Sequence, residues 1–390
     1  MNQTKVLIFI VLAQFFCTSV WFASNSVMPA LMAAYSFPDQ AMGWLTSAVQ
    51  LGFICGTLFY AFFNLADRHS PSRVFFVSAL LAALSNSAVL LLSPEIVLFT
   101  VFRFFVGFFL AGIYPVGMKI AADYFEKGLG RSLGFLVGAL VLGTALPHLL
   151  RSLLIELPWQ AVFVSTSVLC LIGGLLILVF VPDGPFRRPG SGVNFQHTLR
   201  VFKIPAFREA AIGYFGHMWE LYTFWALVPA ILAMQRVEPY QVSILSFVII
   251  AIGAGACVLA GLSSQRWGSG NVARLSLMVS ALCCLVSPFV LLYAPTFIGY
   301  LFLAVWGTFV IADSPMFSKL VASSAIPELK GSALTLVNCL GFALTIFSIQ
   351  LLDFLKSSYA LPYLLPLLAI GPVVGLLMGP KYSNLERKQK

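Results

Sequence analysis

Charged residues are scarce in this chain of 390 residues. Lys, Arg, Asp and Glu make up 9% of it, against about a quarter of a typical soluble domain, and 60% of the residues are hydrophobic. A soluble core cannot bury that much apolar surface, so lipid must surround most of the chain. The length therefore sets the number of membrane-spanning helices, and an ordinary soluble domain is excluded.

Several functional signatures are also missing. The seven cysteines all fall inside apolar runs, where thiols behave as small hydrophobic groups, so no disulfide framework is expected. No Cys or His spacing is typical of a zinc site, and no phosphate loop of the Walker type is present. We therefore expect no metal, no other cofactor and no use of ATP. The basic residues behind the net charge of +9 are scattered among loops, so no nucleic-acid partner is expected.

Long apolar runs make up most of the sequence. A transmembrane helix needs about 20 mostly apolar residues. Barrel strands would alternate over about ten residues, and these runs do not. The first run, Val6 to Val27, is too long for a cleavable signal and lacks an A-x-A site. The sequence therefore predicts an all-α membrane protein with twelve transmembrane helices. The predicted spans, numbered one to twelve, cover residues 5–27, 41–63, 74–93, 96–118, 132–152, 159–181, 209–232, 240–262, 274–294, 296–317, 332–352 and 361–379.

The basic residues indicate the orientation of these spans. An even number of spans puts both termini on one side, and cytoplasmic loops carry an excess of Lys and Arg. If the N-terminus is cytoplasmic, only Arg151, Arg236 and Lys356 of the 23 basic residues lie outside. Arg103 lies within a span. We therefore expect both termini in the cytoplasm, with the protein in a bacterial inner (plasma) membrane.

A central polar stretch divides the spans into six and six. Pro182 to Pro185 ends span six, and a loop rich in Gly, Pro and Arg follows to about Arg208. We predict an N-terminal half at 1–182, a cytoplasmic linker at 183–208, a C-terminal half at 209–380 and a short basic tail at 381–390.

One charged loop motif occurs twice, after spans two and eight. Asp67 to Ser70 reads Asp-Arg-His-Ser, and Gln265 to Gly268 reads Gln-Arg-Trp-Gly. With twelve spans and a central loop, this repeat resembles the major facilitator superfamily, whose loop after the second span reads G-x-x-x-D-R-x-G-R-R. Arg103 and Gly107 resemble the R-x-x-x-G segment of span four in that family. The resemblance implies two pseudo-symmetric six-helix halves and alternating access, and it identifies no sub-family.

The resemblance also implies a gating role for the charges of these loops. Asp67 can face the positive N-terminus of another helix, a contact worth roughly 0.3–1 kcal/mol when exposed. Arg68 or Arg73 could pair with Asp123, just past span four, and Arg266 would serve the second loop. Such contacts would latch the two halves on the cytoplasmic side in one state, and the alternative is that they only anchor the loops. Because the second loop lacks the acid, its latch should be the weaker.

Three charged residues lie deep in the predicted spans. Arg103 is in span four, Glu220 in span seven and Asp313 in span ten. A charge near the bilayer centre costs at least about 2.5–3.5 kcal/mol. In the family fold, spans one, four, seven and ten line the central cavity, so all three residues are expected to face it. Arg103 is permanently charged, and it would bind an anionic substrate or a cycling carboxylate. The alternative is a structural pair with a neighbouring helix.

Glu220 and His217 form the predicted proton site. They are three residues apart and share a helix face. A low-dielectric surrounding favours the uncharged form of a carboxyl group, and histidine changes charge near neutral pH. Asp313 is a second candidate, although with Ser314 it could instead cap backbone groups freed by Pro315. The H-x-x-E spacing could also offer two metal ligands, with Asp313 as a third, but two or three scattered ligands are weak evidence for a metal site.

Polar and aromatic residues on the cavity-lining spans complete the predicted site. The predicted substrate-binding residues are Arg103, Gln14, Trp21, Asn25, Tyr114, Tyr222 and Trp306. The alternative for each aromatic residue is that it packs in the core or at the lipid interface. The glycines expected to allow close helix crossings are Gly52, Gly56, Gly134, Gly138 and Gly253.

These features favour a secondary active transporter. We expect a monomer, surrounded by lipid, that moves a small organic solute by proton-coupled symport, with an anion or zwitterion favoured because of Arg103. A proton-driven exporter of drug-like or cationic compounds is the alternative, because two acids accompany one arginine. An enzyme would need a nucleophile, a base and an oxyanion site within reach. A receptor or scaffold would normally carry a large soluble domain.

Overall fold

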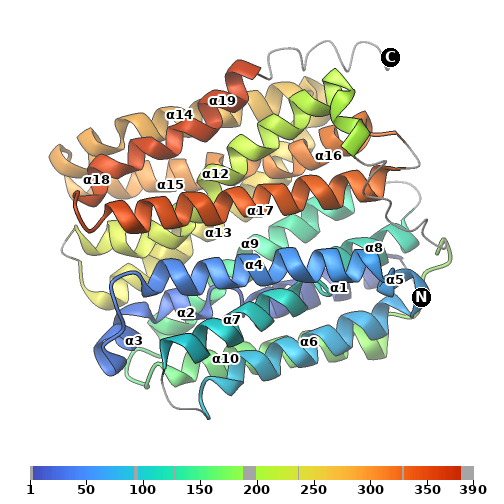
Figure 1. Cartoon of the computed structure of the whole chain (residues 1–390), viewed down its shortest axis with the longest axis horizontal. Coiled ribbons are helices and arrows are strands. Elements are labelled where there is room, and N and C mark those ends of the chain that lie inside the picture. The colour runs from blue at the N-terminus through green and yellow to red at the C-terminus, as the bar shows by residue number, and fades with distance from the viewer. Residues whose placement is uncertain are drawn as a thin grey trace. The chain divides into compact units, whose positions relative to one another are not determined.

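The computed structural model describes residues 3–91, 95–125, 129–187, 199–235, 237–326 and 329–378. Every regular element in these ranges is a helix (Figure 1), so the predicted all-α fold class is confirmed. The predicted tail at 381–390 and the middle of the predicted linker lie outside the described residues.

The first six predicted spans are all helical. The elements are α1 (Gln3–Thr18), α2 (Ala23–Ser26), α3 (Met28–Tyr35), α4 (Ala41–Phe62), α5 (Leu65–Arg68), α6 (Pro71–Ala88), α7 (Ile96–Leu110), α8 (Tyr114–Tyr124), α9 (Leu129–Leu153) and α10 (Gln160–Phe180). Span one corresponds to α1 and α2, and α3 lies beyond its predicted end at residue 27. Span four corresponds to α7 and α8, while spans two, three, five and six are the single helices α4, α6, α9 and α10. The short helix α5 belongs to the loop that carries Asp67.

The last six predicted spans are helical as well. The elements are η1 (Leu199–Lys203), α12 (Pro205–Ala233), α13 (Pro239–Trp267), α14 (Ser269–Tyr293), α15 (Thr296–Ala312), α16 (Ser314–Ser324), α17 (Lys330–Leu355), α18 (Leu361–Leu364), η3 (Leu365–Ala369) and α19 (Ile370–Met378). Span ten corresponds to α15 and α16, and span twelve to α18, η3 and α19. Span seven is α12, which begins at Pro205 rather than at residue 209.

Nine segments in the described ranges are long and apolar enough to cross a membrane. The other three predicted spans fall short because they are broken or more polar. Span one is interrupted after Thr18, which leaves α1 with 16 residues. Four serines and an asparagine make α6 more polar, and α12 carries Arg208, Glu209 and Glu220. Two of these three, spans one and seven, carry predicted site residues, whereas span four with Arg103 and span ten with Asp313 are among the nine apolar segments.

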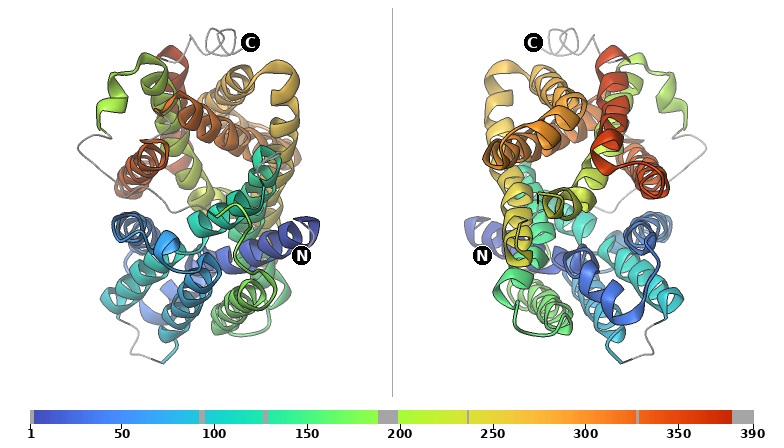
Figure 2. Two further views of the ribbon diagram at one scale, coloured as in Figure 1. Left: turned by 90° about the vertical axis from the view of Figure 1, so that its right-hand side faces the viewer. Right: turned by 90° about the vertical axis from the view of Figure 1, so that its left-hand side faces the viewer.

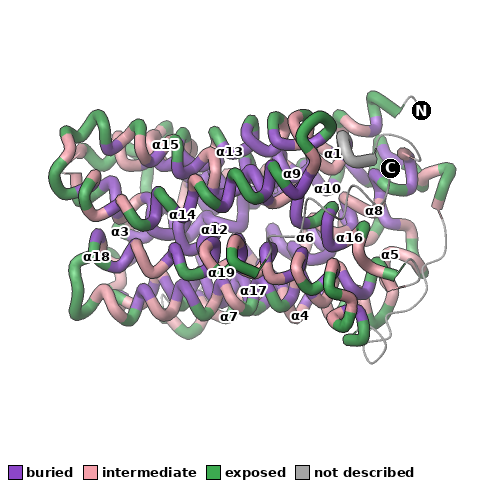
Figure 3. Tube along the Cα trace, turned by 90° about the horizontal axis from the view of Figure 1, so that it is seen from above, coloured by how far each residue is buried: buried purple, intermediate pink, exposed green. Residues whose placement is uncertain are grey.

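The helices expose apolar side chains and bury polar ones. A stripe of residues that are half exposed or more runs along α14, at Met278, Leu282, Leu285 and Phe289. Ser280 and Ser287 of the same helix are buried. The tube in Figure 3 shows how exposed and buried positions alternate along the long helices. A soluble amphipathic helix has the opposite arrangement, so these outer faces are built to contact lipid.

Spans four and ten break at corresponding places. α8 and α16 both begin one residue before a proline, Pro115 or Pro315. Proline lacks a backbone N–H, and its ring clashes with the carbonyl four residues earlier, so a helix breaks there. In span ten that carbonyl belongs to Ile311, and it accepts a hydrogen bond from the Cys257 thiol at 3.5 Å. The interruption expected at Pro315 is therefore present.

Span one breaks without a proline at the break. The turn at residues 19–22 separates α1 from α2, so the prediction of one continuous helix at 5–27 is wrong. The physical reason is a competing donor, because the guanidinium of Arg103 hydrogen-bonds to the Trp21 carbonyl inside this turn. Sequence periodicity cannot reveal a donor that arrives from another span.

The contacts between Cα atoms divide the chain into two compact units. The first contains residues 1–192 and 237–251, and the second contains residues 193–236 and 252–390. Figure 2 looks along the helices and shows the long helices of each unit side by side in a bundle, blue to green for the first and mostly orange to red for the second.

Glycine allows the closest helix crossing in the first unit. A Cβ atom added to Gly52 of α4 would lie 1.9 Å from the Phe104 carbonyl oxygen of α7. One added to Gly107 of α7 would lie 1.9 Å from the Val49 carbonyl oxygen of α4. Gly56 packs on α7 in the same way, so the crossing predicted for Gly52 and Gly56 is confirmed. The same prediction for Gly134 is wrong, because a Cβ there meets no atom within 4 Å.

We predict that Gly107→Val destabilises the protein strongly. The added side chain must push α4 and α7 apart, and overpacking of this kind costs about 1–3 kcal/mol or more. The melting temperature of the protein purified in detergent micelles measures the effect. Gly134→Val is the matched control and should change that temperature little, since its Cβ meets open space. Equal losses at the two glycines would contradict the reciprocal crossing.

Candidate functional site

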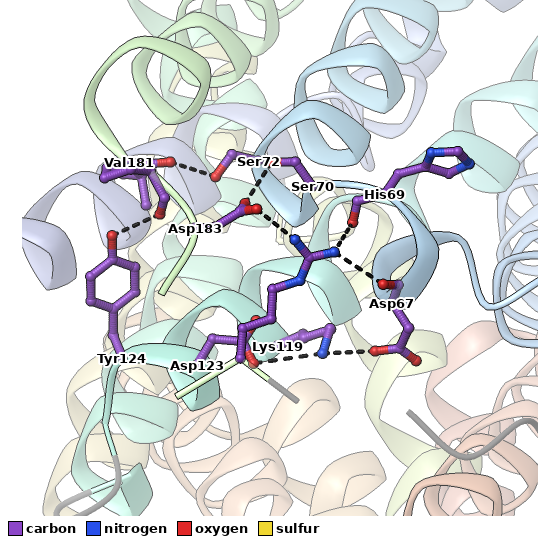
Figure 4. Close-up of polar contacts among 11 residues, drawn as sticks. Asp67, His69, Ser70, Ser72, Lys119, Asp123, Tyr124, Val181 and Asp183 are labelled. Atoms are coloured by element: carbon purple, nitrogen blue, oxygen red, sulfur yellow. Dashed lines mark hydrogen bonds and ion pairs between the residues drawn. The ribbon is translucent and has the colours of Figure 1, made fainter. Parts of the chain in front are cut away.

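Lys119 of α8 joins the acids of the first charged loop. Its Nζ atom lies 2.8 Å from Asp67 Oδ1 and 3.6 Å from Asp123 Oδ1 (Figure 4). Lys119 and Asp123 are one helical turn apart, which brings the two side chains together. The predicted pairing of Arg68 or Arg73 with Asp123 is wrong, because Lys119 reaches the acid from its own helix. In the described part of the chain, Arg68 and Arg73 are exposed and form no ion pair.

The segment that follows α10 is tied to the same loop by Arg187. The guanidinium of Arg187 contacts Asp183 Oδ2 at 2.5 Å and donates to the Asp67 and His69 carbonyls at 3.0 and 2.7 Å. Those carbonyls lie at the end of α5, where a helix leaves acceptors unpaired. The hydroxyl of Ser70 donates to Asp183 Oδ1 at 2.6 Å. Figure 4 shows Asp183 beside Ser70 and Ser72, with Lys119 between Asp67 and Asp123.

Hydrogen bonds to backbone carbonyls hold the segment after α10 against α6 and α8. Ser72 Oγ donates to the Val181 carbonyl at 2.5 Å, and the Tyr124 hydroxyl donates to the Pro182 carbonyl at 2.7 Å. A Cβ atom added to Gly184 would lie 2.3 Å from the carbonyl oxygen of Asp123. The start of the predicted linker is therefore packed against α6 and α8, and only a residue without a side chain fits at position 184.

The second unit repeats part of this arrangement without the acids. Lys319 of α16 lies four residues after Pro315, as Lys119 of α8 lies four residues after Pro115, so the two lysines occupy equivalent places. The Lys319 Nζ atom hydrogen-bonds to the Ser269 hydroxyl at 2.9 Å instead of pairing with a carboxylate. Arg266 is exposed and forms no ion pair with any described residue. The second loop thus has no ion pair among the described residues, and the weaker latch stays a prediction.

Arg103 is fully buried and bound by neutral groups. One terminal nitrogen donates to Asn86 Oδ1 of α6 at 3.0 Å, and the other donates to the Trp21 carbonyl. Asn86 in turn donates to Thr166 and Ser167 of α10 at 3.1 and 2.9 Å. The arginine thus links α6, α7 and α10 to the turn of span one. No carboxylate lies within 4.0 Å of it among the described residues.

Glu220 is also fully buried and receives three donors. Its carboxylate accepts from Ser280 Oγ at 2.7 Å, from Cys284 Sγ at 3.2 Å and from Trp306 Nε1 at 2.6 Å. The Trp306 ring stacks on Phe224 at 4.4 Å between ring centroids, which fixes the indole beside the carboxylate. Glu220 therefore joins α12 to α14 and α15 and has no cation beside it in the part of the chain that the structure describes.

His217 pairs with Asp313 rather than with Glu220. His217 Nδ1 lies 2.8 Å from Asp313 Oδ1, and both side chains are buried. Glu220 shares the helix with His217, but its carboxylate is directed toward α14 and α15. Asp313 ends α15 at the break, and its side chain makes no capping bond to α16. The titratable pair therefore joins α12 to the broken point of span ten.

The other predicted substrate-binding residues are only partly brought together. Asn25 donates to Thr46 of α4 at 2.8 Å, and Gln14 is buried on α1. In the second unit, Tyr222 packs against Trp225 and Phe342 with ring centroids 5.3 and 5.2 Å apart. The remaining two, Trp21 and Tyr114, are respectively buried and half-buried. Their part in substrate binding stays a prediction.

Several residues of these clusters were missed from the sequence. They are Asn86, Lys119, Arg187, Ser280 and Cys284. The recurrence of a lysine four residues after Pro115 and Pro315 could have revealed Lys119. The others are ordinary polar residues whose importance comes from partners on distant spans. Among the described residues, no group of three or more His, Cys, Asp or Glu side chains could bind a metal.

The chain is similar to known membrane transporters in sequence pattern and in fold. A family model described as Major Facilitator Superfamily matches residues 10–349. The crystal structure of a bacterial homolog to the human lysosomal transporter Spinster, inward-facing and occupied, has a TM-score of 0.75 at 13% identity and covers 98% of this chain and 97% of its own. The proton:xylose symporter XylE, bound to 6-bromo-6-deoxy-D-glucose, has a TM-score of 0.77 at 12% identity, with coverage of 97% and 95%. No curated protein sequence matches. The predicted twelve-helix fold in two halves is thereby confirmed.

We predict that Asn86→Leu destabilises the protein by about 1–3 kcal/mol, because it leaves a buried guanidinium donor without an acceptor. The melting temperature in detergent micelles should fall accordingly. Ser85→Ala is the control on the same helix, since the Ser85 hydroxyl bonds only to its own helix, at the Leu81 carbonyl. If both variants melt together with the parent protein, Asn86 does not support Arg103.

Proposed function

Because the chain belongs to the Major Facilitator Superfamily, we propose that it is a proton-coupled secondary transporter of a small organic solute. It is an integral membrane protein with the fold of the transporters in this family. We assign it to a bacterial inner membrane with both termini in the cytoplasm, which the distribution of basic residues supports. We also propose that it works as a monomer by alternating access.

The contact between His217 and Asp313 carries the proposal of proton coupling. Both side chains are buried, and their nearest atoms are 2.8 Å apart. When both ring nitrogens of His217 carry a proton, its positive charge balances the Asp313 carboxylate and the pair is neutral overall. When His217 is uncharged, an unbalanced carboxylate charge remains in a medium of low dielectric, which is unfavourable. Because Asp313 lies where span ten breaks, the two states would favour different bends of that span.

Glu220 is the second acid of this half and fits a supporting role. Three donors from α14 and α15 hold its carboxylate. If Glu220 takes up a proton on Oε2, that oxygen can donate to the Ser280 hydroxyl, while Oε1 still accepts from the Trp306 indole. Protonation would therefore keep the contact of Glu220 with α15 but weaken it, because the acceptor loses its charge. This links the acid of span seven to span ten a second time.

The favoured mode is symport, as in one structural relative, and export by antiport is the alternative. XylE is a proton:xylose symporter, and at 12% identity it supports the fold rather than the substrate. Two buried acids in one unit favour the alternative of a cationic cargo. The anion preference that Arg103 suggested is weakened, because two of its nitrogens already bind Asn86 and the Trp21 carbonyl.

We predict that Asp313→Asn abolishes uphill uptake of the solute into proteoliposomes under a pH gradient of either direction. Exchange of labelled solute in the absence of a gradient should continue. The physical reason is that the amide keeps the shape of the side chain but cannot cycle with His217. The solute would first be found by a thermal-shift screen, and internal pyranine fluorescence would report proton movement. Asp39→Asn makes the same change at an exposed site and should leave coupling intact. Undiminished proton movement in Asp313→Asn would remove the pair from the mechanism.

We predict that a cysteine at position 69 is labelled from the cytoplasm. His69 is exposed, and its hydrogen bonds with described residues involve only its backbone, so His69→Cys leaves the loop intact. Gly184 is unsuitable for this test, because a side chain there would clash with Asp123. Leu157→Cys in the loop between α9 and α10, where Leu157 is exposed, serves as the opposite marker. Labelling of position 69 by an impermeant maleimide added to intact cells would invert the assigned topology.

A further inference from the structure

A cavity of about 460 Å³ lies where the end of α10 meets the start of α6. It is lined by Ser70, Ser72 and Arg73 on one side, and by Leu178 and residues 181–183 on the other. All of these residues belong to the first unit. The cavity therefore brings together polar groups from two distant parts of the sequence, and its ligand depends on which of these groups are still free.

One positive charge in this cavity has no counter-ion. Of the described residues that line it, Arg73 is the only basic one, and its exposed side chain forms no ion pair in the described part of the chain. The lining acid, Asp183, is already compensated, because Oδ1 accepts from Ser70 at 2.6 Å and Oδ2 contacts the Arg187 guanidinium at 2.5 Å. The cavity therefore suits a ligand with a single negative charge.

The hydroxyl groups of the cavity are placed to accept. Ser70 donates its proton to Asp183, and Ser72 donates to the Val181 carbonyl, as Figure 4 shows. Each hydroxyl oxygen can still accept a hydrogen bond, so the part of the ligand beside it must be a donor. An ammonium group would also donate, but it would bring a second positive charge to Arg73 and find no uncompensated carboxylate. Uncharged hydroxyl groups fit this side of the cavity better.

Apolar side chains continue from the cavity along both helices. Val77 and Leu84 follow Arg73 at spacings of four and seven residues, so they share its face of α6, and they are 49% and 56% exposed. On α10, which packs against α6, Leu178 and Leu175 are exposed as well. Arg73 and Leu84 lie about 16 Å apart along the helix, close to the depth of one leaflet of hydrocarbon, about 15 Å. A headgroup in the cavity can therefore extend its acyl chains along these faces.

We propose that this cavity binds the headgroup of one phosphatidylglycerol molecule. Its phosphodiester pairs with the Arg73 guanidinium, and its glycerol hydroxyls donate to Ser70 and Ser72. Its acyl chains lie along Val77 and Leu178. Basic pockets between transmembrane helices bind anionic headgroups in this way. Cardiolipin would bring a second phosphate for which the lining residues offer no second free cation.

This lipid site depends only on the chain being a membrane protein, so it stands or falls apart from the proposed transport activity. A lipid bound there would join α6 to the segment after α10, beside the contacts of Asp183 with Ser70 and Arg187. The loop that carries Asp67 would then be held by lipid as well as by protein.

The first test compares headgroups on the same acyl chains. The full-length protein, purified in detergent and stripped of lipid, is titrated with dioleoyl phosphatidylglycerol, phosphatidylethanolamine or phosphatidylcholine and followed by native mass spectrometry. The first molecule of phosphatidylglycerol should bind at least about five-fold more tightly than the other two lipids, because only it carries a net negative charge. Equal affinities for the three lipids, or a preference for a zwitterionic one, would overturn the proposal.

The second test locates the site and separates lipid from soluble phosphate. Arg73→Gln should lose the preference for phosphatidylglycerol. Arg68→Gln is the matched control and should keep it, since Arg68 is exposed, forms no ion pair with a described residue and does not line the cavity. Equal losses in the two variants would show a general effect of surface charge and contradict the site. Glycerol phosphate and inorganic phosphate should leave the melting temperature unchanged, and a stabilisation by either that Arg73→Gln removes would assign the cavity to a soluble anion instead.

Discussion

A charge inside a bilayer has no water around it, so the protein itself must supply its hydrogen bonds. Arg103 and Glu220 meet this requirement in the same way, since neutral groups of the same unit bind each of them. Asn86 and Cys284, which bind these two charges, both lie sixteen residues after the N-cap of their helix. The two units therefore use one equivalent position to hold opposite charges, and the polar interior of each is arranged around it.

The same requirement explains how broken helices are tolerated in this fold. A break frees backbone carbonyls, and each must find a donor. The Trp21 carbonyl finds the guanidinium of Arg103, and the Ile311 carbonyl finds the Cys257 thiol. The break in span one is therefore fixed by a permanent charge. The break in span ten lies beside Asp313, whose partner can gain or lose a proton, and on the proposed mechanism this makes the second break the mobile one.

Local features of the fold could be predicted from the sequence, and partner choice could not. The twelve spans, the break at Pro315 and the crossing at Gly52 follow from composition, ring geometry and the lack of a side chain. His217 was expected beside Glu220 because spacing on one helix is readable, but its partner comes from another span. The cavity beside Arg73 carried no signal either, because a space between two helices is visible only when every neighbour is known.

The sequence by itself determined that lipid surrounds most of the chain and that the chain crosses the bilayer in two related sets of spans. It also determined that three ionisable residues lie within those spans. The first and third properties follow from the energy of transferring each residue into hydrocarbon and from the order of the residues, and the two related sets are what the repeated loop motif and the family resemblance imply. Only the tertiary structure decided what each of these residues binds: Arg103 the turn of span one, Glu220 the indole of Trp306, and Asp313 the imidazole of His217. A hydrogen bond between spans depends on distances of a few ångströms, and those distances are set by how the helices pack.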